Sequence, residues 1–125
     1  MLLLAPAAAA AQASLGPGAG RVVIRRGTTA ITLAVTPNSS GGWNTATVTA
    51  AVRGNPVRRG HVHLSFTMLA MSMGTQRFAL KEVRSGIYRY VGPGFLMSGD
   101  WRLEVEVAPR RGRPFTADVR DVVRG

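Results

Sequence analysis

The strongest constraint on the fold of this chain is an alternation of apolar and polar residues that recurs along its length. Residues 101–107 read WRLEVEV, with apolar side chains at every second position and charged ones between them. Successive side chains of a β-strand point to opposite faces, so this pattern predicts a strand with one buried and one solvated face. No segment keeps apolar residues at helical spacing over three turns. The chain is therefore expected to be built from strands.

Eight segments show strand patterns, and clusters of Gly, Pro, Asn and Ser separate them as turns. They are residues 22–24, 31–35, 46–52, 62–68, 78–80, 86–90, 101–107 and 115–119. Eight short strands in about 100 residues are typical of an all-β, immunoglobulin-like sandwich, in which two antiparallel sheets with seven to eight strands in total pack face to face. The pair Gly86 and Tyr88 resembles the tyrosine corner of such folds, although an aromatic residue at a sheet edge explains it equally well.

The first residues, MLLLAPAAAAAQAS, are typical of an export signal. An apolar run leads to the small-x-small sequence Ala11-Gln12-Ala13, which predicts cleavage before Ser14 and an exported protein of the periplasm or extracellular space. The run is shorter than the roughly 20 residues that span a bilayer. No later segment could cross a membrane either, so no transmembrane segment is expected in the mature chain. No Lys or Arg precedes the run, and an alanine-rich disordered tail is the alternative. The expected organisation is a signal over 1–13, a flexible segment over 14–20 and one domain over 21–125.

The charge of the chain is strongly positive, at +10, and fifteen of its sixteen basic residues are arginine. They are spread along the sequence, with pairs at 25–26, 58–59 and 110–111 in predicted turns. No basic run is interleaved with aromatic residues that could stack on bases, so specific nucleic-acid binding is not expected. Weak attraction to anionic surfaces is the interpretation that the charge favours.

Most of the soft donor atoms of the chain lie in residues 61–75, HVHLSFTMLAMSMGT. The chain has no cysteine, two histidines and five methionines, which excludes disulfides and thiolate metal sites and leaves thioethers and imidazoles as soft ligands. Cu(I) prefers thioethers, and imidazole also serves divalent copper. Met68 follows the apolar parity of its strand, so we assign it to the core.

Strand directions decide which donors could act together. Successive strands of a sandwich run in opposite directions, so Met71 and Met73, in one connection, and Met97, two connections later, are expected at the same end. Trp43 lies in another connection of that end. His61 and His63 begin their strand, and the eight residues from His63 to Met71 span about 26 Å at roughly 3.3 Å per residue. The sequence therefore offers a Cu(I) site of Met71, Met73 and Met97, and a separate, weaker site of His61 and His63 for a divalent ion.

Each of these donors also has a purely structural interpretation. Methionines at the base of a loop often fill irregular gaps in a core. Ser65 and Thr67 continue the strand face of the two histidines, which indicates a solvated face. Trp43 and Trp101 are expected to be buried.

A series of landmarks along the chain resembles the YtkA-like domain family. They are SGGWN, GNPVRRGHVHLSF, MLAMSMG, LKEVRSGIYRY, FLMSGDWRLEVEV and PFTADV, over residues 38–119. The family is related to FixH and to the C-terminal domain of copper-resistance fusions of the CopC–CopD type. The resemblance implies an exported or membrane-associated β-sandwich, often linked to copper handling, with copper as the implied cofactor and a membrane or periplasmic copper-handling protein as partner. Transport itself is not implied for this isolated domain.

No motif of an enzyme is present: there is no GxSxG sequence, no P-loop and no metalloprotease helix, and the chain is expected to be a non-enzyme. Two functions remain open. One is binding or delivery of copper in metal homeostasis. The other is a non-metal structural or interaction module of the cell envelope that docks a membrane or periplasmic partner.

Overall fold

The computed structural model describes residues 13–72 and 74–125, and within them the chain is all-β. The strands are β1 (Ala13–Leu15), β2 (Gly20–Arg26), β3 (Thr29–Thr36), β4 (Asn44–Val52), β5 (Asn55–Pro56), β6 (His61–Met68), β7 (Thr75–Arg84), β8 (Ile87–Gly92), β9 (Gly99–Ala108) and β10 (Phe115–Val123). Each of the eight strands expected from the sequence is present, so the all-β class is confirmed. The strand count differs from the seven to eight expected, because β1 and the two-residue β5 are additional.

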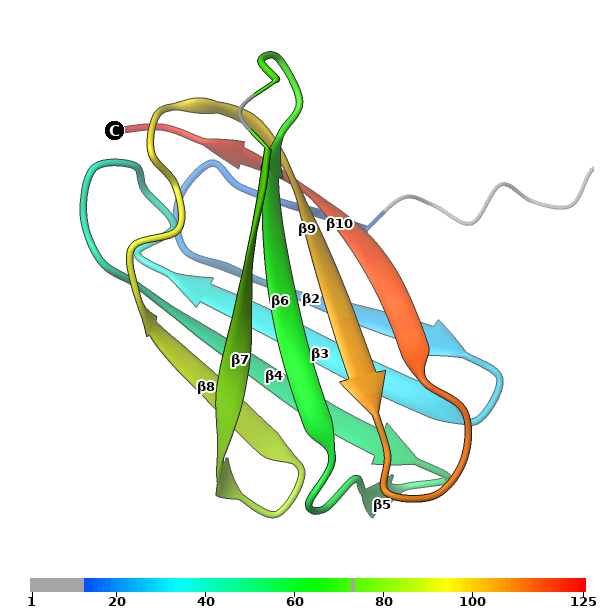
Figure 1. Cartoon of the computed structure of the whole chain (residues 1–125). Helices are drawn as coiled ribbons and strands as arrows, with labels where there is room; N and C mark the ends of the chain where they lie inside the picture. Colours follow the sequence, from blue (N-terminus) through cyan, green and yellow to red (C-terminus); the bar gives the residue numbers. More distant parts are fainter. Residues whose placement is uncertain (1–12, 73) are drawn as a thin grey trace, which may run out of the picture.

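The strands form one hydrogen-bonded path in the order β1-β10-β9-β6-β7-β8-β4-β3-β2, with β5 beside β4. In Figure 1, β6, β7, β9 and β10 lie in front of β2, β3, β4 and β8. Strand β7 pairs with β6 over most of its length and with β8 near its end, so it joins the two halves. The sequence predicts two separate antiparallel sheets; the structure instead has a continuous, nearly closed path that includes one parallel pair, β1 with β10.

The core lies between the two halves and follows the predicted alternation. Every second residue of β6 from Val62 to Met68 is buried, and so is every second residue of β9 from Trp101 to Val107. The prediction that Met68 and Trp101 are core residues is therefore confirmed. Trp43 was also expected to be buried, but 71% of its surface is exposed, and that prediction is wrong. It lies just before β4, where no strand alternation directs its side chain inward.

A chain of five aromatic rings crosses the core. Tyr90 stacks on Phe78 with ring centroids 4.4 Å apart, and Phe78 meets Phe66 edge-on at 5.6 Å. Phe66 meets Phe95 at 5.1 Å, and Phe95 meets Trp101 at 5.4 Å, both edge-on. Such arrangements are favoured by the ring quadrupoles in addition to the burial of apolar area. The contacts connect β6, β7, β8 and β9 with the connection from β8 to β9.

Strand β1 brings part of the N-terminal segment into the fold. Residues 14–20 were expected to be flexible, whereas Ala13–Leu15 pairs with Val119–Asp121 of β10 and Leu15 is buried. Beside this pair, the side-chain amide of Asn38 donates to the carboxyl group of Asp121 at 2.8 Å and to the carbonyl of Gly18 at 2.9 Å. These contacts tie three segments together: the β1–β2 connection, the β3–β4 connection and the end of β10.

Asp121 is fully buried, and burial raises its pKa to about 6. Among the described residues, Oδ2 of Asp121 and Oδ1 of Asn38 have no hydrogen-bond partner. A proton on the carboxyl group removes the buried charge and adds a donor beside an amide that already contacts it. The protonated form therefore suits this environment.

The first prediction concerns the inward face of β9. Replacing a buried Trp by Ala typically costs about 3–5 kcal/mol of the free energy of unfolding, and Trp101 also donates from Nε1 to the carbonyl of Met97 at 3.0 Å. We expect Trp101→Ala to lose this amount in urea denaturation. Arg102→Ala, on the exposed face, should lose less than about 1 kcal/mol. Equal losses in the two variants would contradict this assignment of a buried and an exposed face to β9.

The second prediction concerns the pH dependence of stability. The folded state holds the proton of Asp121 more tightly than the unfolded chain does, so this stabilisation is complete below the ordinary pKa of 3.8 and is lost as pH rises through about 6. Between about pH 5 and about pH 8, Asp121 alone should lower the free energy of unfolding by roughly 1 kcal/mol. The contribution of Asp121 is the difference in the free energy of unfolding between the wild type and Asp121→Asn, measured by urea denaturation at each pH. A difference that does not change with pH would contradict the prediction.

Candidate functional site

Three connections lie at one end of the molecule, as the strand directions predicted (Figure 1). They join β3 to β4, β6 to β7, and β8 to β9. The strand registers agree with this placement: Thr36 pairs with Thr45, Asn44 with Gly92, and Met68 with Trp101.

Hydrogen bonds hold the β3–β4 and β8–β9 connections against each other. The amide of Gly41 donates to the carbonyl of Phe95 at 3.2 Å, and the hydroxyls of Ser40 and Ser98 lie 3.0 Å apart. The side chain of Asn44 closes the first connection, since its amide donates to the carbonyl of Ser39 and its oxygen accepts from the amide of the same residue. The two connections therefore form one braced surface.

Met71 lies on the β6–β7 connection with 52% of its surface exposed. At the base of this connection the hydroxyls of Thr67 and Thr75 lie 2.8 Å apart, and the amide of Leu69 donates to the carbonyl of Asp100. A shallow hollow of about 410 Å³ opens beside it, lined by residues 67–72, 74–75 and Arg102. Met73, the neighbouring candidate ligand, lies outside the described residues.

Met97 lies on the β8–β9 connection with 39% of its surface exposed. Its carbonyl accepts the hydrogen bond from Trp101, so the buried indole fixes the backbone that carries the thioether. Phe95, two residues earlier, is buried in the aromatic chain. Neither Met71 nor Met97 fills the core. Both residues are exposed at the same end of the molecule.

Other large apolar side chains are exposed on the same three connections. A second hollow, of about 300 Å³, is lined by Gly41, Gly42, Trp43, Pro93, Phe95 and Leu96. We call the exposed apolar residues of these connections the apolar end: Trp43, Leu69, Met71, Leu96 and Met97. Leu69 and Leu96 were not among the site residues predicted from the sequence. The sequence feature that could have identified them is an apolar residue inside a predicted turn, where no strand face accounts for it.

The two histidines lie at the start of β6, away from the apolar end. His61 is exposed, and Nδ1 of His63 is 4.0 Å from the carboxylate of Glu106. The same carboxylate accepts a hydrogen bond from Arg77 at 2.9 Å, so it is already engaged. Over residues 13–72 and 74–125, no three His, Asp or Glu side chains come together as a metal site would require. The pair therefore has no third donor of these types.

Within the part of the chain that the structure describes, no helix has the length and apolar character needed to span a membrane.

Comparison with known proteins agrees with the landmarks of the sequence. No curated protein and no solved structure matches the chain. The sequence model of the YtkA-like family matches residues 26–106, which include β3 to β8, most of β9 and the three connections of the apolar end. The match covers well over half of the chain, and the protein therefore belongs to the YtkA-like family.

Proposed function

We propose that this protein is an exported β-domain of the cell envelope that binds or helps to deliver Cu(I) through the methionines of its apolar end. The single observation that carries the proposal is the exposure of Met71 and Met97 on two connections at the same end of the molecule. Methionine is usually buried, where it fills apolar gaps in a core, so its exposure is unusual. The exposure of these two methionines therefore calls for a functional explanation.

The donor set supports a cuprous ion rather than the other common metals. Thioethers are soft ligands that suit Cu(I), whereas Zn²⁺ takes thiolate, imidazole or carboxylate, and Ca²⁺ takes oxygen. The chain has no thiolate, and its imidazoles lie at the start of β6. Met71 and Met97 are the residues that would hold the ion, with Met73 as the third thioether that the sequence predicts. Bound there, Cu(I) would be accessible for transfer to a partner.

Export is part of this proposal. It rests on the N-terminal sequence pattern, and a compartment outside the cytoplasm is where a cysteine-free thioether site would meet copper without competition from cytosolic thiols. The partner would be a membrane or periplasmic copper-handling protein.

The third prediction tests the thioethers directly. The variant Met71→Leu/Met73→Leu/Met97→Leu keeps side-chain volume and apolar character, a change that usually costs less than about 1.5 kcal/mol per position. It should remain folded and lose Cu(I) affinity, because leucine has no lone pair to donate. Competition with a chromogenic Cu(I) chelator measures the affinity, and the wild type should bind one equivalent.

Two variants serve as controls for this experiment. Met68→Leu makes the same replacement at a buried position of β6 and should leave Cu(I) affinity unchanged. His61→Gln/His63→Gln removes the imidazoles and should also leave it unchanged. If the triple methionine variant retained wild-type affinity, the copper proposal would be wrong.

A second candidate function is an interaction module that docks a membrane or periplasmic partner without metal. It is favoured by Trp43 and Leu96, which are more than half exposed beside a hollow and offer no metal ligand. Exposed aromatic and aliphatic side chains gathered on one surface are typical of protein interaction sites.

The fourth prediction separates this second function from copper binding. A photo-crosslinking amino acid at Trp43 or Leu96 should give a covalent adduct of defined mass in intact cells. The same amino acid at Val23, which is exposed on β2 away from the three connections, should give none. The triple Met→Leu variant should keep the adduct, since leucine preserves the apolar surface. Loss of the adduct in that variant would argue against metal-free docking.

A further inference from the structure

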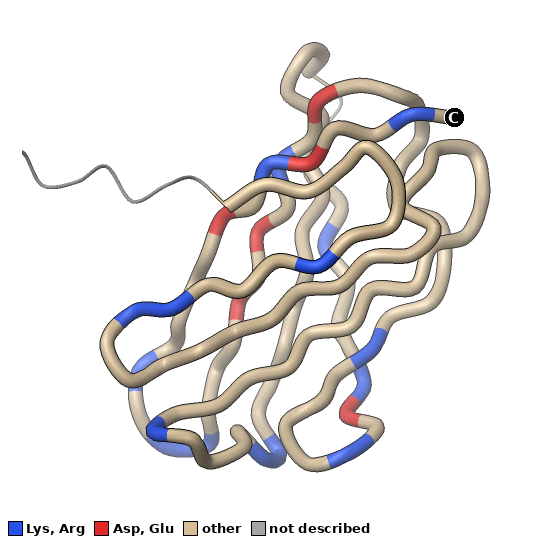
Figure 2. Tube along the Cα trace, turned by 180° about the vertical axis from the view of Figure 1, so that it is seen from behind, with Lys and Arg blue, Asp and Glu red and all other residues tan. Residues whose placement is uncertain are grey.

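The end of the molecule opposite the apolar end carries most of the positive charge. Five connections lie there, which join β2 to β3, β4 to β5, β5 to β6, β7 to β8, and β9 to β10, and nine arginines lie in these connections or in the last residues of the strands before them. We call them the basic end: Arg25, Arg26, Arg53, Arg58, Arg59, Arg84, Arg110, Arg111 and Arg113. All nine are exposed. Figure 2 shows Lys and Arg gathered towards this end of the trace, while most Asp and Glu lie in the other half.

Strand pairing brings these connections together although they are far apart in sequence. Thr29 pairs with Val52, and the amide of Arg53 donates to the carbonyl of Thr28 at 2.8 Å. The amide of Ala50 donates to the carbonyl of Gly86 at 2.9 Å. His61 pairs with Ala108, which places the connection before β6 beside the one after β9. The arginines therefore share one surface.

Buried hydrogen bonds hold the Arg58–Arg59 segment in place. The hydroxyl of Tyr88 donates to the carbonyl of Val57 at 2.6 Å and accepts from the amide of Gly60 at 3.0 Å. Glu82 accepts from the amides of Gly86 and Arg59, and these bonds lower the pKa of its carboxyl group. The segments of this end are residues 25–29, 52–61, 82–87 and 108–115, and Glu82 is the one acidic residue in them. Its carboxylate already accepts hydrogen bonds from backbone amides.

The guanidinium groups of the basic end are available to a ligand. None of the nine arginines forms an ion pair with a described acidic side chain. Arg26 is partly engaged, since it donates to the carbonyl of Thr116 and lies over the ring of Phe115. The ion pairs of the described residues, Arg77 with Glu106 and Arg120 with Asp100, lie outside this end.

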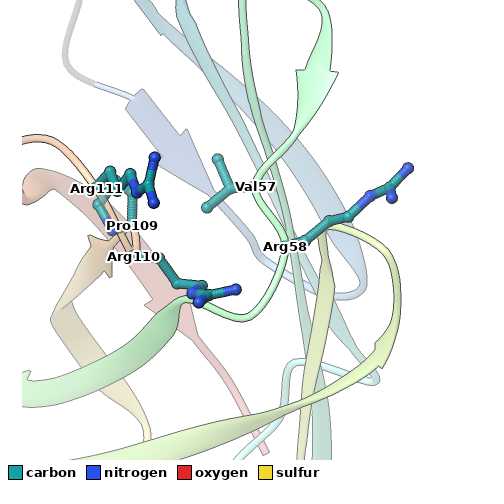
Figure 3. A pocket seen from close by; sticks show the side chains of 5 residues that line it. All are labelled: Val57, Arg58, Pro109, Arg110 and Arg111. Atoms are coloured by element: carbon teal, nitrogen blue, oxygen red, sulfur yellow. The ribbon is translucent and has the colours of Figure 1, made fainter.

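Two open hollows lie between these arginines. The arginine side chains do not converge on one point. One, of about 300 Å³, is lined by Val57, Arg58, Pro109, Arg110 and Arg111. Figure 3 shows the side chain of Arg58 extending away from those of Arg110 and Arg111, with Val57 between them. The other, of about 350 Å³, lies on the far side of Arg58, beside Arg59 and Arg84. Guanidinium groups that fan out over a broad surface suit several phosphates side by side rather than one enclosed anion.

We propose that the basic end docks on an anionic phospholipid bilayer, with its arginines contacting the phosphates of lipid headgroups. Clustered basic residues bind such a surface because its negative potential attracts each of them. The arrangement at the tips of five connections presents them to an extended plane. The proposal does not depend on copper binding, because the methionines lie at the other end.

Charge complementarity and shape favour a bilayer over the other anionic occupants. Single-stranded nucleic acid is usually bound by exposed aromatic rings that stack on bases. The aromatic residues of this end are Tyr88, which is buried, and Phe115, which is partly covered by Arg26. A second copy of the chain that presented the same end would be repelled by its like charge.

The fifth prediction is a vesicle-binding measurement on the full chain. Co-sedimentation with vesicles of phosphatidylglycerol in phosphatidylcholine should show binding that weakens as NaCl is raised, and pure phosphatidylcholine vesicles should bind little. Each basic side chain near an anionic membrane strengthens binding about fivefold. The variant Arg58→Gln/Arg59→Gln/Arg110→Gln/Arg111→Gln should therefore bind at least about a hundredfold more weakly.

A matched control separates the surface from the net charge. Arg21→Gln/Arg102→Gln/Arg120→Gln/Arg124→Gln removes the same number of charges from exposed positions outside the basic end and should weaken binding less than about threefold, because salt screens charges beyond about 10 Å. If the first variant fails to melt cooperatively, Arg53→Gln/Arg84→Gln/Arg111→Gln/Arg113→Gln replaces it with the same expected loss.

Three results would overturn the proposal. Equal weakening in the basic-end and control variants would show an effect of net charge alone. Equal binding to phosphatidylcholine vesicles would show that lipid charge is not recognised. Tighter binding to an oligonucleotide than to phosphatidylglycerol vesicles at the same salt would assign the basic end to nucleic acid. Cu(I) affinity should be the same in all these variants, so failure here leaves the copper proposal untouched.

Discussion

The contacts among five aromatic rings link the place where the two halves of the strand path meet to the connection that carries Met97. Phe66, Phe78 and Tyr90 come from neighbouring strands β6, β7 and β8 at the point where β7 joins the two halves of the path. Phe95 and Trp101 extend the same contacts to the connection that carries Met97. The packing around Phe66 is close, since a Cβ atom on Gly94 would lie 2.6 Å from its ring. The apolar end is thus continuous with the core, and its exposed side chains are attached to closely packed backbone.

The two ends of the molecule differ in chemistry because the connections at each end carry different kinds of residue. At one end, backbone and side-chain hydrogen bonds brace connections that expose thioethers and an indole. At the other, the buried hydroxyl of Tyr88 anchors a connection that carries guanidinium groups. This bond resembles the tyrosine corner expected from the sequence in that the hydroxyl contacts backbone, but its partner is 31 residues upstream. A membrane contact through the basic end would turn the apolar end towards the aqueous side, where a soluble partner can reach it.

The strands and their buried faces could be predicted from the sequence because alternation reports burial directly. Residues 62–68 and 101–107 gave both the strands β6 and β9 and the side chains that face the core. Strand β1 could not be found in this way, since three residues carry no period and their pairing depends on a partner about a hundred residues later. Trp43 lies in a glycine-rich turn, where residue type says nothing about direction. The placement of Met71 and Met97 followed from strand direction, whereas the basic end emerges only when distant turns are brought together by register.

The pairing of β1 with β10 has a consequence for how this protein behaves among copies of itself. An open edge of a sheet is a template on which another chain can add a strand. Here the outer side of β10 is occupied in turn: the carbonyl of Thr116 accepts from Arg26, residues Val119–Asp121 pair with β1, and the carbonyl of Arg124 accepts from Ser40. These groups come from three different segments, so no single local opening exposes the whole edge. This edge of the sheet is thereby protected against intermolecular strand addition.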